Sequence, residues 1–138
     1  MKVLIDTNVI LDVFLSREPH LVHAKELLSL CGGEITGCII ASQTTDIFYL
    51  MRRYGKNARL VKEALKTLVE NVKVLEIVPA DVNNALSSAM DDYEDALLAC
   101  CAKRQRVEYI ITRNEADFKL SPVPALSPQA FLEKFFEG

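Results

Sequence analysis

The residues of this chain that are best suited to catalysis are four aspartates spread along its length. Asp6, Asp46, Asp95 and Asp117 each lie close to an end of a predicted strand or helix. Carboxylates that are gathered in one place raise each other's pKa unless a cation lies between them. Their hard oxygen atoms suit Mg²⁺ or Mn²⁺, and such ions activate water for in-line displacement at phosphorus. This pattern therefore favours metal-assisted chemistry on a phosphate ester.

The first of these aspartates directly follows a short apolar run. Residues 3–5 read Val-Leu-Ile without alternation, which is typical of a buried parallel strand. Residues 9–14 are then apolar at helical spacing. Asp6 therefore lies where a strand gives way to a helix, and ligands of open α/β sheets bind beyond the carboxyl ends of the strands.

The rest of the chain alternates helices with strands. Apolar spacing and Gly or Pro breaks predict helices over residues 20–31, 43–54, 58–70, 79–89, 93–104 and from 128 onward, and strands over 35–41, 72–78, 109–112 and 123–126. Strands that alternate with helices indicate a mostly parallel sheet. We therefore expect a single domain over residues 1–138, an α/β/α sandwich of three layers around about five strands.

The expected topology decides which aspartates can meet. Strand ends and the starts of the helices that follow them share one edge of a parallel sheet, so Asp6, Asp46 and the loop that holds Asp117 are predicted to converge. Asp95 lies in the first turn of the helix over 93–104, which leads into the next strand by a short connection. We expect that turn at the opposite edge unless the helix is tilted, so topology alone does not place Asp95 in the site.

Helix capping is an alternative explanation for some of these acids. Asp46 and the acidic residues 92–95 lie in first helical turns, where a carboxylate caps backbone amides and suits the helix dipole. The capping and metal-binding hypotheses have equal weight for them. Asp6 has no cap to make unless it caps the helix that follows it.

Composition limits the classes of protein that need to be considered. The 138 residues carry a net charge of −3, so no overall positive field attracts nucleic acid. The four cysteines form no C-x-x-C motif or disulfide framework. No apolar run has the length of a signal peptide core or a membrane span. We expect a cytoplasmic protein with no membrane association.

Basic residues nevertheless cluster in places that suit RNA. Arg52 and Arg53 end the predicted helix over 43–54, and Arg113 lies beside the late acids. Such side chains contact phosphates and hold a strand in place, and Arg113 is the strongest candidate because of its position. A solvated helix face is the better explanation for any one of the others.

Three segments in a fixed order carry a family resemblance. Residues 4–8 (LIDTN), 92–97 (DYEDAL) and 110–118 (IITRNEADF), with 124–132 after them, together resemble the PIN domain, the nuclease fold of VapC-type toxins. The resemblance implies an endoribonuclease that uses Mg²⁺ or Mn²⁺ to hydrolyse RNA phosphodiester bonds with a metal-activated water, leaving 5′-phosphate and 3′-hydroxyl ends. It also implies a toxin with an antitoxin partner, and a homodimer.

The resemblance assigns roles to individual residues. Asp6 and Asp95 match the family's principal metal ligands, so Asp95 is expected in the site, and Asp117 matches a third acid. Thr7 and Asn8 match polar neighbours that steady the first acid or the attacking water. This chain departs from the family at Asp46, where many members have Glu, and at Asn114, where many have Asp.

Two other functions compete with the nuclease. A phosphatase with Asp6 as nucleophile usually needs a general acid two residues later, and Asn8 occupies that position. The second alternative is a weakly active or inactive PIN-like module that binds RNA or a protein. Asn114 and Asp46 favour it, because an amide is a neutral ligand and Asp46 is shorter than Glu.

Overall fold

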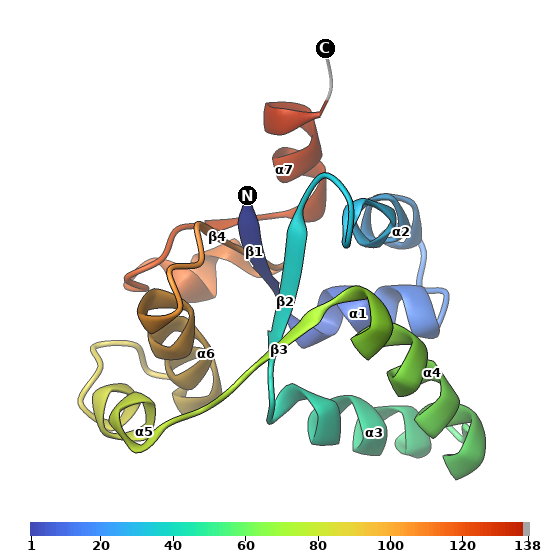
Figure 1. Cartoon of the computed structure of the whole chain (residues 1–138), viewed down its shortest axis with the longest axis horizontal. Helices are drawn as coiled ribbons and strands as arrows, with labels where there is room; N and C mark the ends of the chain where they lie inside the picture. Colours follow the sequence, from blue (N-terminus) through green and yellow to red (C-terminus); the bar gives the residue numbers. More distant parts are fainter. Residues whose placement is uncertain (137–138) are drawn as a thin grey trace.

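Five parallel strands form the centre of the molecule. The computed structural model describes residues 1–136, so residues 137 and 138 of the expected domain lie outside the described part. The strands run in the order β3-β2-β1-β4-β5, and Figure 1 shows β1 and β2 side by side. Every neighbouring pair is parallel, so the predicted sheet is confirmed. The strands are β1 (Lys2–Ile5), β2 (Thr36–Ile40), β3 (Lys73–Leu75), β4 (Tyr109–Ile111) and β5 (Ala125–Leu126).

Helices cover both faces of the sheet, as the three-layer prediction requires (Figure 1). The strand period of two sends Val3 and Ile5 into one apolar core and Leu4 into the other. The first core is completed by α1 (Thr7–Phe14), α2 (Leu21–Leu30), α3 (Gln43–Arg53), α4 (Ala58–Asn71) and α7 (Pro128–Phe135). The second core is completed by α5 (Pro79–Leu86) and α6 (Tyr93–Arg104).

Two elements differ from the sequence-based prediction. The third strand covers three residues instead of the expected 72–78, and its pairing with β2 ends at Leu75. Directly beyond it, the carbonyl oxygen of Glu76 accepts from the Arg104 guanidinium of α6 at 2.8 Å. The expected loop after β4 also contains a short 3₁₀ helix, η1 (Glu115–Phe118).

The expectation that α6 begins at the opposite edge of the sheet is wrong. A helix that connects two parallel strands runs antiparallel to both, because it must return the chain to the edge where the next strand begins. The first turn of α6 therefore lies at the carboxyl edge, where Asp95 lines the same cavity as Asp6. No tilt of the helix is needed to bring these two aspartates together.

Within residues 1–136, no helix combines the length and the apolar character that crossing a bilayer requires.

Candidate active site

A cavity of about 300 Å³ lies at the carboxyl edge of the sheet, where β1, β4, α6 and η1 meet. It contains most of the residues that the sequence pointed to. Of the predicted site residues, the cavity is lined by Asp6, Thr7, Asn8, Asp95, Arg113, Asn114 and Asp117. Asp46, Arg52 and Arg53 are absent from the lining of the cavity.

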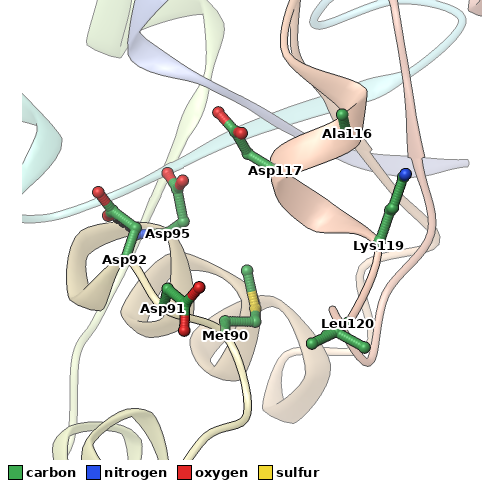
Figure 2. A pocket seen from close by; sticks show the side chains of 8 residues that line it. All are labelled: Met90, Asp91, Asp92, Asp95, Ala116, Asp117, Lys119 and Leu120. Atoms are coloured by element: carbon green, nitrogen blue, oxygen red, sulfur yellow. Dashed lines mark hydrogen bonds between the residues drawn. The ribbon is translucent and has the colours of Figure 1, made fainter.

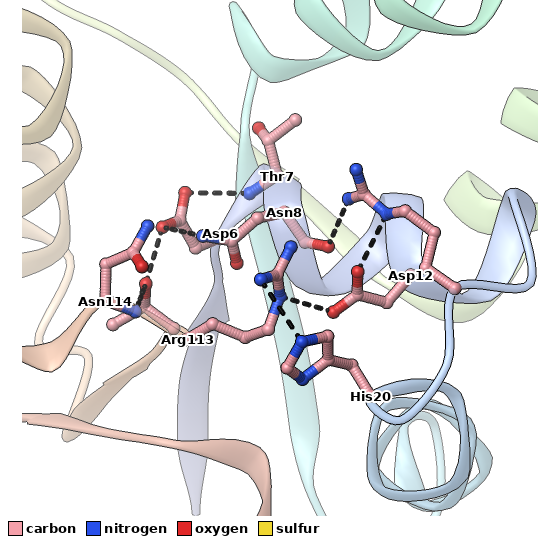
Figure 3. A network of polar contacts seen from close by, with 9 residues as sticks. Asp6, Thr7, Asn8, Asp12, His20, Arg113 and Asn114 are labelled. Atoms are coloured by element: carbon pink, nitrogen blue, oxygen red, sulfur yellow. Dashed lines mark hydrogen bonds and ion pairs between the residues drawn. The ribbon is translucent and has the colours of Figure 1, made fainter. Parts of the chain in front are cut away.

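Asp6 is the most firmly held of the acids (Figure 3). It caps α1, since Oδ1 accepts from the backbone amide of Thr7 at 2.8 Å. Oδ2 accepts from the Thr112 hydroxyl at 2.7 Å and from the Asn8 amide nitrogen at 3.4 Å. Burial raises the pKa of Asp6 above its ordinary value, against the opposing effect of the hydrogen bonds from Thr112 and Thr7. Asp6 therefore does cap the helix that follows it, and its second carboxylate oxygen is held by Thr112 and Asn8.

A buried glutamine joins the ends of the two central strands beneath Asp6. Gln43 donates through Nε2 to the Ile5 carbonyl at 2.8 Å and to the Thr7 hydroxyl at 3.2 Å. Its Oε1 accepts from the Ile40 amide at 2.7 Å. These bonds fix the strand-to-helix turn that presents Asp6. Sequence reasoning assigned no role to Gln43 or Thr112, because a neutral polar residue carries no signal until its partner is known.

Asp92, and not Asp95, makes the side-chain cap of α6. Asp92 is the N-cap of α6, and its Oδ1 accepts from the Asp95 backbone amide at 2.9 Å. The Asp95 carboxylate is thereby left to face the cavity. Burial, and then the charges of Asp92, Asp6, Asp117 and Glu94, raise the pKa of Asp95 to about 7.

A second hollow of about 510 Å³ adjoins the first and shares Asp95 and Asp117 with it. Figure 2 shows the two sides of this hollow, with Asp91, Asp92 and Asp95 on one side and Asp117 and Lys119 on the other. The acids Asp95 and Asp117 thus lie between two open spaces.

Glu94 lines the active-site cavity, although sequence reasoning gave it no role there. Burial, and then the charges of Asp46, Asp92 and Asp6, raise its pKa. The pKa of Asp46 is also raised by burial. Asp46 does not line the cavity, and Glu94 supplies the fourth acid there. Its place in the same first helical turn as Asp95 was the available signal.

Arg113 is not a free cation but part of a buried ion-pair network (Figure 3). Its Nε lies 2.7 Å from Oδ2 of Asp12, a carboxylate whose side chain is 0% exposed. Arg17 binds the other oxygen of Asp12 at 2.9 Å and donates to the Asn8 carbonyl at 3.1 Å. Two guanidinium groups share one carboxylate, so this ion-pair group keeps a net positive charge beside the acids of the cavity. Sequence reasoning did not anticipate the role of Asp12.

The other predicted substrate contacts lie elsewhere. Arg52 and Arg53 are exposed in the last turn of α3, and Arg52 donates to the Lys56 carbonyl at 3.1 Å. They lie on the surface beyond the cavity lining, although Leu50 and Tyr54 from the same helix end contribute to that lining.

The chemistry of the donor set fits a hard divalent cation. Asp6, Glu94, Asp95 and Asp117 bring carboxylate oxygens to one cavity, and their repulsion contributes to the high pKa of Asp95. Within residues 1–136, no group of three or more His, Cys, Asp or Glu is gathered closely enough to hold an ion as the side chains stand.

The sequence of this chain matches a known protein family, and its fold is similar to those of solved structures. The family model described as "PIN domain" matches residues 2–116. FitAcB from Neisseria gonorrhoeae is similar in structure with a TM-score of 0.74 and 18% identity, over 92% of this chain and 98% of that one. VapBC2 from Rickettsia felis, solved with a DNA fragment from its promoter, gives 0.72 and 15% over 92% and 98%.

A third structure extends the set. VapC20 from Mycobacterium tuberculosis, described as a toxin that cleaves the Sarcin-Ricin loop, has a TM-score of 0.64 and 13% identity over 78% of this chain and 86% of that one. At these identities the likeness establishes the fold. No protein of curated function matches the sequence.

Proposed function

This chain belongs to the PIN domain family, and we propose that it is an endoribonuclease that depends on Mg²⁺ or Mn²⁺. One observation carries the proposal. The carboxylates of Asp6, Asp95 and Asp117 line one cavity at the carboxyl edge of the sheet, where their mutual repulsion favours a bound cation. Chemistry at a phosphodiester is the reaction that such a site serves best.

Each residue of the site has a definite part in this proposal. Asp6, Asp95 and Asp117 would hold the ion, which supplies an activated water and positive charge at the scissile phosphate. Thr112 and Asn8 orient Asp6 through their hydrogen bonds. The amide of Asn114 is a neutral donor at the cavity wall. Arg113 and Arg17 present positive charge to the substrate phosphate from the same wall.

The solved relatives suggest the biological setting. One of them is described as a toxin-antitoxin complex from Klebsiella pneumoniae, with a TM-score of 0.69 and 20% identity. We propose that this chain is likewise a toxin that forms a homodimer and is bound by an antitoxin protein in the cytoplasm. A neighbouring gene for a small DNA-binding protein that co-purifies with the chain would support this role. The absence of such a gene would weaken the toxin role and leave the nuclease role untouched.

The nuclease proposal is tested by incubating the purified chain with a mixed structured RNA in Mg²⁺, in Mn²⁺ and in EDTA. We expect cleavage in either metal and none in EDTA. Asp6→Asn and Asp95→Asn should each abolish cleavage. Glu115→Gln is the matched control, because Glu115 is an exposed acid of η1 outside the cavity lining. Cleavage that survives in Asp6→Asn would refute the mechanism.

A non-catalytic binding module is the second candidate. It is favoured by the neutral amide of Asn114 in the lining of the cavity. This candidate predicts RNA or protein binding that is unchanged by metal, with no cleavage in any condition. Calorimetric titration of the folded protein with Mn²⁺ distinguishes the two, since only the nuclease proposal predicts binding that Asp95→Asn weakens.

A further inference from the structure

A third hollow lies on the far side of Arg113 from the acids. It has a volume of about 170 Å³ and is lined by His20, His23, Arg113, Ser127, Pro128 and Gln129. These residues come from the start of α2, the end of β4 and the start of α7. The lining contains two imidazoles and a guanidinium but no carboxylate, in contrast to the acidic cavity beside it.

Arg113 connects the two spaces. It lines both the acidic cavity and the hollow with the histidines. One of its terminal nitrogens lies 3.5 Å from Nε2 of His20, and its Nε is held by Asp12 at 2.7 Å (Figure 3). The buried carboxylate fixes the orientation of the guanidinium, which leaves its other nitrogens directed at neighbouring groups. A ligand that reaches from one space to the other must therefore pass this guanidinium.

The charges on either side of the acids are opposite in kind. The hollow beyond Asp95 and Asp117 is lined by Asp91 and Asp92 against the single cation Lys119 (Figure 2). The hollow beyond Arg113 has only neutral or basic side chains. A nucleic acid strand has a negative phosphate at every step, so its backbone is attracted to one side of the acids and repelled from the other.

We propose that the hollow formed by His20, His23 and Arg113 binds a phosphate group of the RNA strand that neighbours the phosphate cleaved at the acids. Imidazole and guanidinium nitrogens donate to phosphate oxygens, and the bidentate geometry of arginine suits that group. The inference rests on the proposed nuclease function for its substrate. The site itself is a phosphate site whether or not cleavage occurs.

The first test uses inorganic phosphate and the metal-free protein in EDTA. The chain has two histidines, and both line this hollow, so their ring signals in an NMR spectrum report on it alone. We expect phosphate to shift both ring signals with a single affinity, and Arg113→Gln to weaken that affinity by about tenfold, as expected for the loss of a charge-assisted hydrogen bond. Ring signals that stay unmoved at tens of millimolar phosphate would overturn the proposal.

The second test measures the affinity of single-stranded RNA for the double variant His20→Gln/His23→Gln, also in EDTA. We expect the affinity for RNA to fall about tenfold. The slope of log affinity against log salt concentration should become shallower by about the amount that one phosphate contact contributes. Arg59→Gln/Lys62→Gln on α4 is the matched control, because it removes two basic side chains from a separate surface. An equal loss in both double variants would show general attraction to basic residues and overturn the specific site.

Neither test requires catalysis, so the two proposals fail separately. Phosphate that shifts the ring signals of a protein unable to cleave RNA would sustain this site and refute the nuclease. Metal-dependent cleavage with ring signals that phosphate does not move would sustain the nuclease and refute this site. Thermal unfolding of each variant confirms that the exposed His20 and the partly exposed His23 can be replaced without loss of the fold.

Discussion

The hydroxyl of Thr112 donates a 2.7 Å hydrogen bond to Oδ2 of Asp6 and so links the end of β4 to the end of β1. Thr112 is 0% exposed, and its hydroxyl also accepts from the Asn114 backbone amide at 3.1 Å. One buried side chain therefore sets the position of the first acid and of the loop that carries the last one. A hydrogen bond of this kind orients the carboxylate and favours its charged form, which lowers its pKa.

Replacement of this hydroxyl tests its importance. In Thr112→Val the carboxylate of Asp6 loses a donor, so its pKa should rise further and its orientation should become less defined. We expect metal affinity and RNA cleavage to fall about tenfold to a hundredfold, measured by calorimetry and by initial rates. Thr112→Ser keeps the hydroxyl and should stay close to the parent. Equal activity of the Val and Ser variants would contradict this role.

The structure also predicts which acid of the Asp46 and Glu94 pair matters more. Glu94 lines the active-site cavity, whereas Asp46 does not. We therefore expect Glu94→Gln to reduce the cleavage rate at saturating metal by about tenfold or more, the usual scale for a group acting in the transition state. The fold reduction of the cleavage rate in Asp46→Asn should be less than half of that in Glu94→Gln. A greater loss of cleavage rate in Asp46→Asn than in Glu94→Gln would contradict this prediction and favour Asp46 as the site residue.

The stability of the metal-free protein should fall as pH rises from about 4 to about 7. The Asp95 pKa is raised from 3.8 to about 7 by burial and by neighbouring acids, so the folded chain keeps a proton that the unfolded chain releases. Asp6 and Glu94 are raised in the same direction. The pKa of Asp81 is lowered despite its burial, because Arg104 binds its carboxylate. Titration of Asp81 therefore changes the stability only at pH values below this range. Thermal unfolding in EDTA at pH 5 and pH 7.5 measures the difference.

Asp95→Asn should therefore stabilise the metal-free protein at pH 7.5 while removing activity. The amide keeps the shape of the side chain and removes a charge that its neighbours repel. We expect a higher unfolding temperature than the parent in EDTA, and a smaller rise than the parent on addition of Mn²⁺. Glu115→Gln should change neither quantity. A lower unfolding temperature for Asp95→Asn in EDTA would show that the carboxylate supports the fold.

The Asp12 network should contribute measurably to stability. Asp12→Asn leaves Arg113 and Arg17, both about 30% exposed or less, without the carboxylate that holds them. We expect the free energy of unfolding in urea to fall by about 1–3 kcal/mol, less than for a fully buried pair because the guanidiniums can reach water. Glu63→Gln removes the exposed partner of Arg59 and should cost under about 0.5 kcal/mol. Equal losses of unfolding free energy in Asp12→Asn and Glu63→Gln would show that burial of the carboxylate does not make the Asp12 ion pairs more stabilising.

The sequence by itself determined the layers of the fold and most of the acids. The apolar run before Asp6 and the alternation of strands with helices identify a parallel sheet, because the period of burial differs between the two kinds of element. Local rules also identify the helix starts, including the cap that Asp92 makes for α6. Strand ends in such a sheet share an edge, which is enough to bring Asp6 and the loop of Asp117 together.

Only the tertiary structure decided how these residues are supported and which neighbours join them. Thr112 lies 106 positions from Asp6, and Gln43 lies 36 positions from Thr7, so no local pattern connects either pair. The same holds for Arg113 and the buried Asp12, whose ion pair no local pattern indicates. Hydrogen bonds and ion pairs depend on distances of a few ångströms between elements, and the periodicity of a sequence fixes which face a residue occupies but not what lies opposite it.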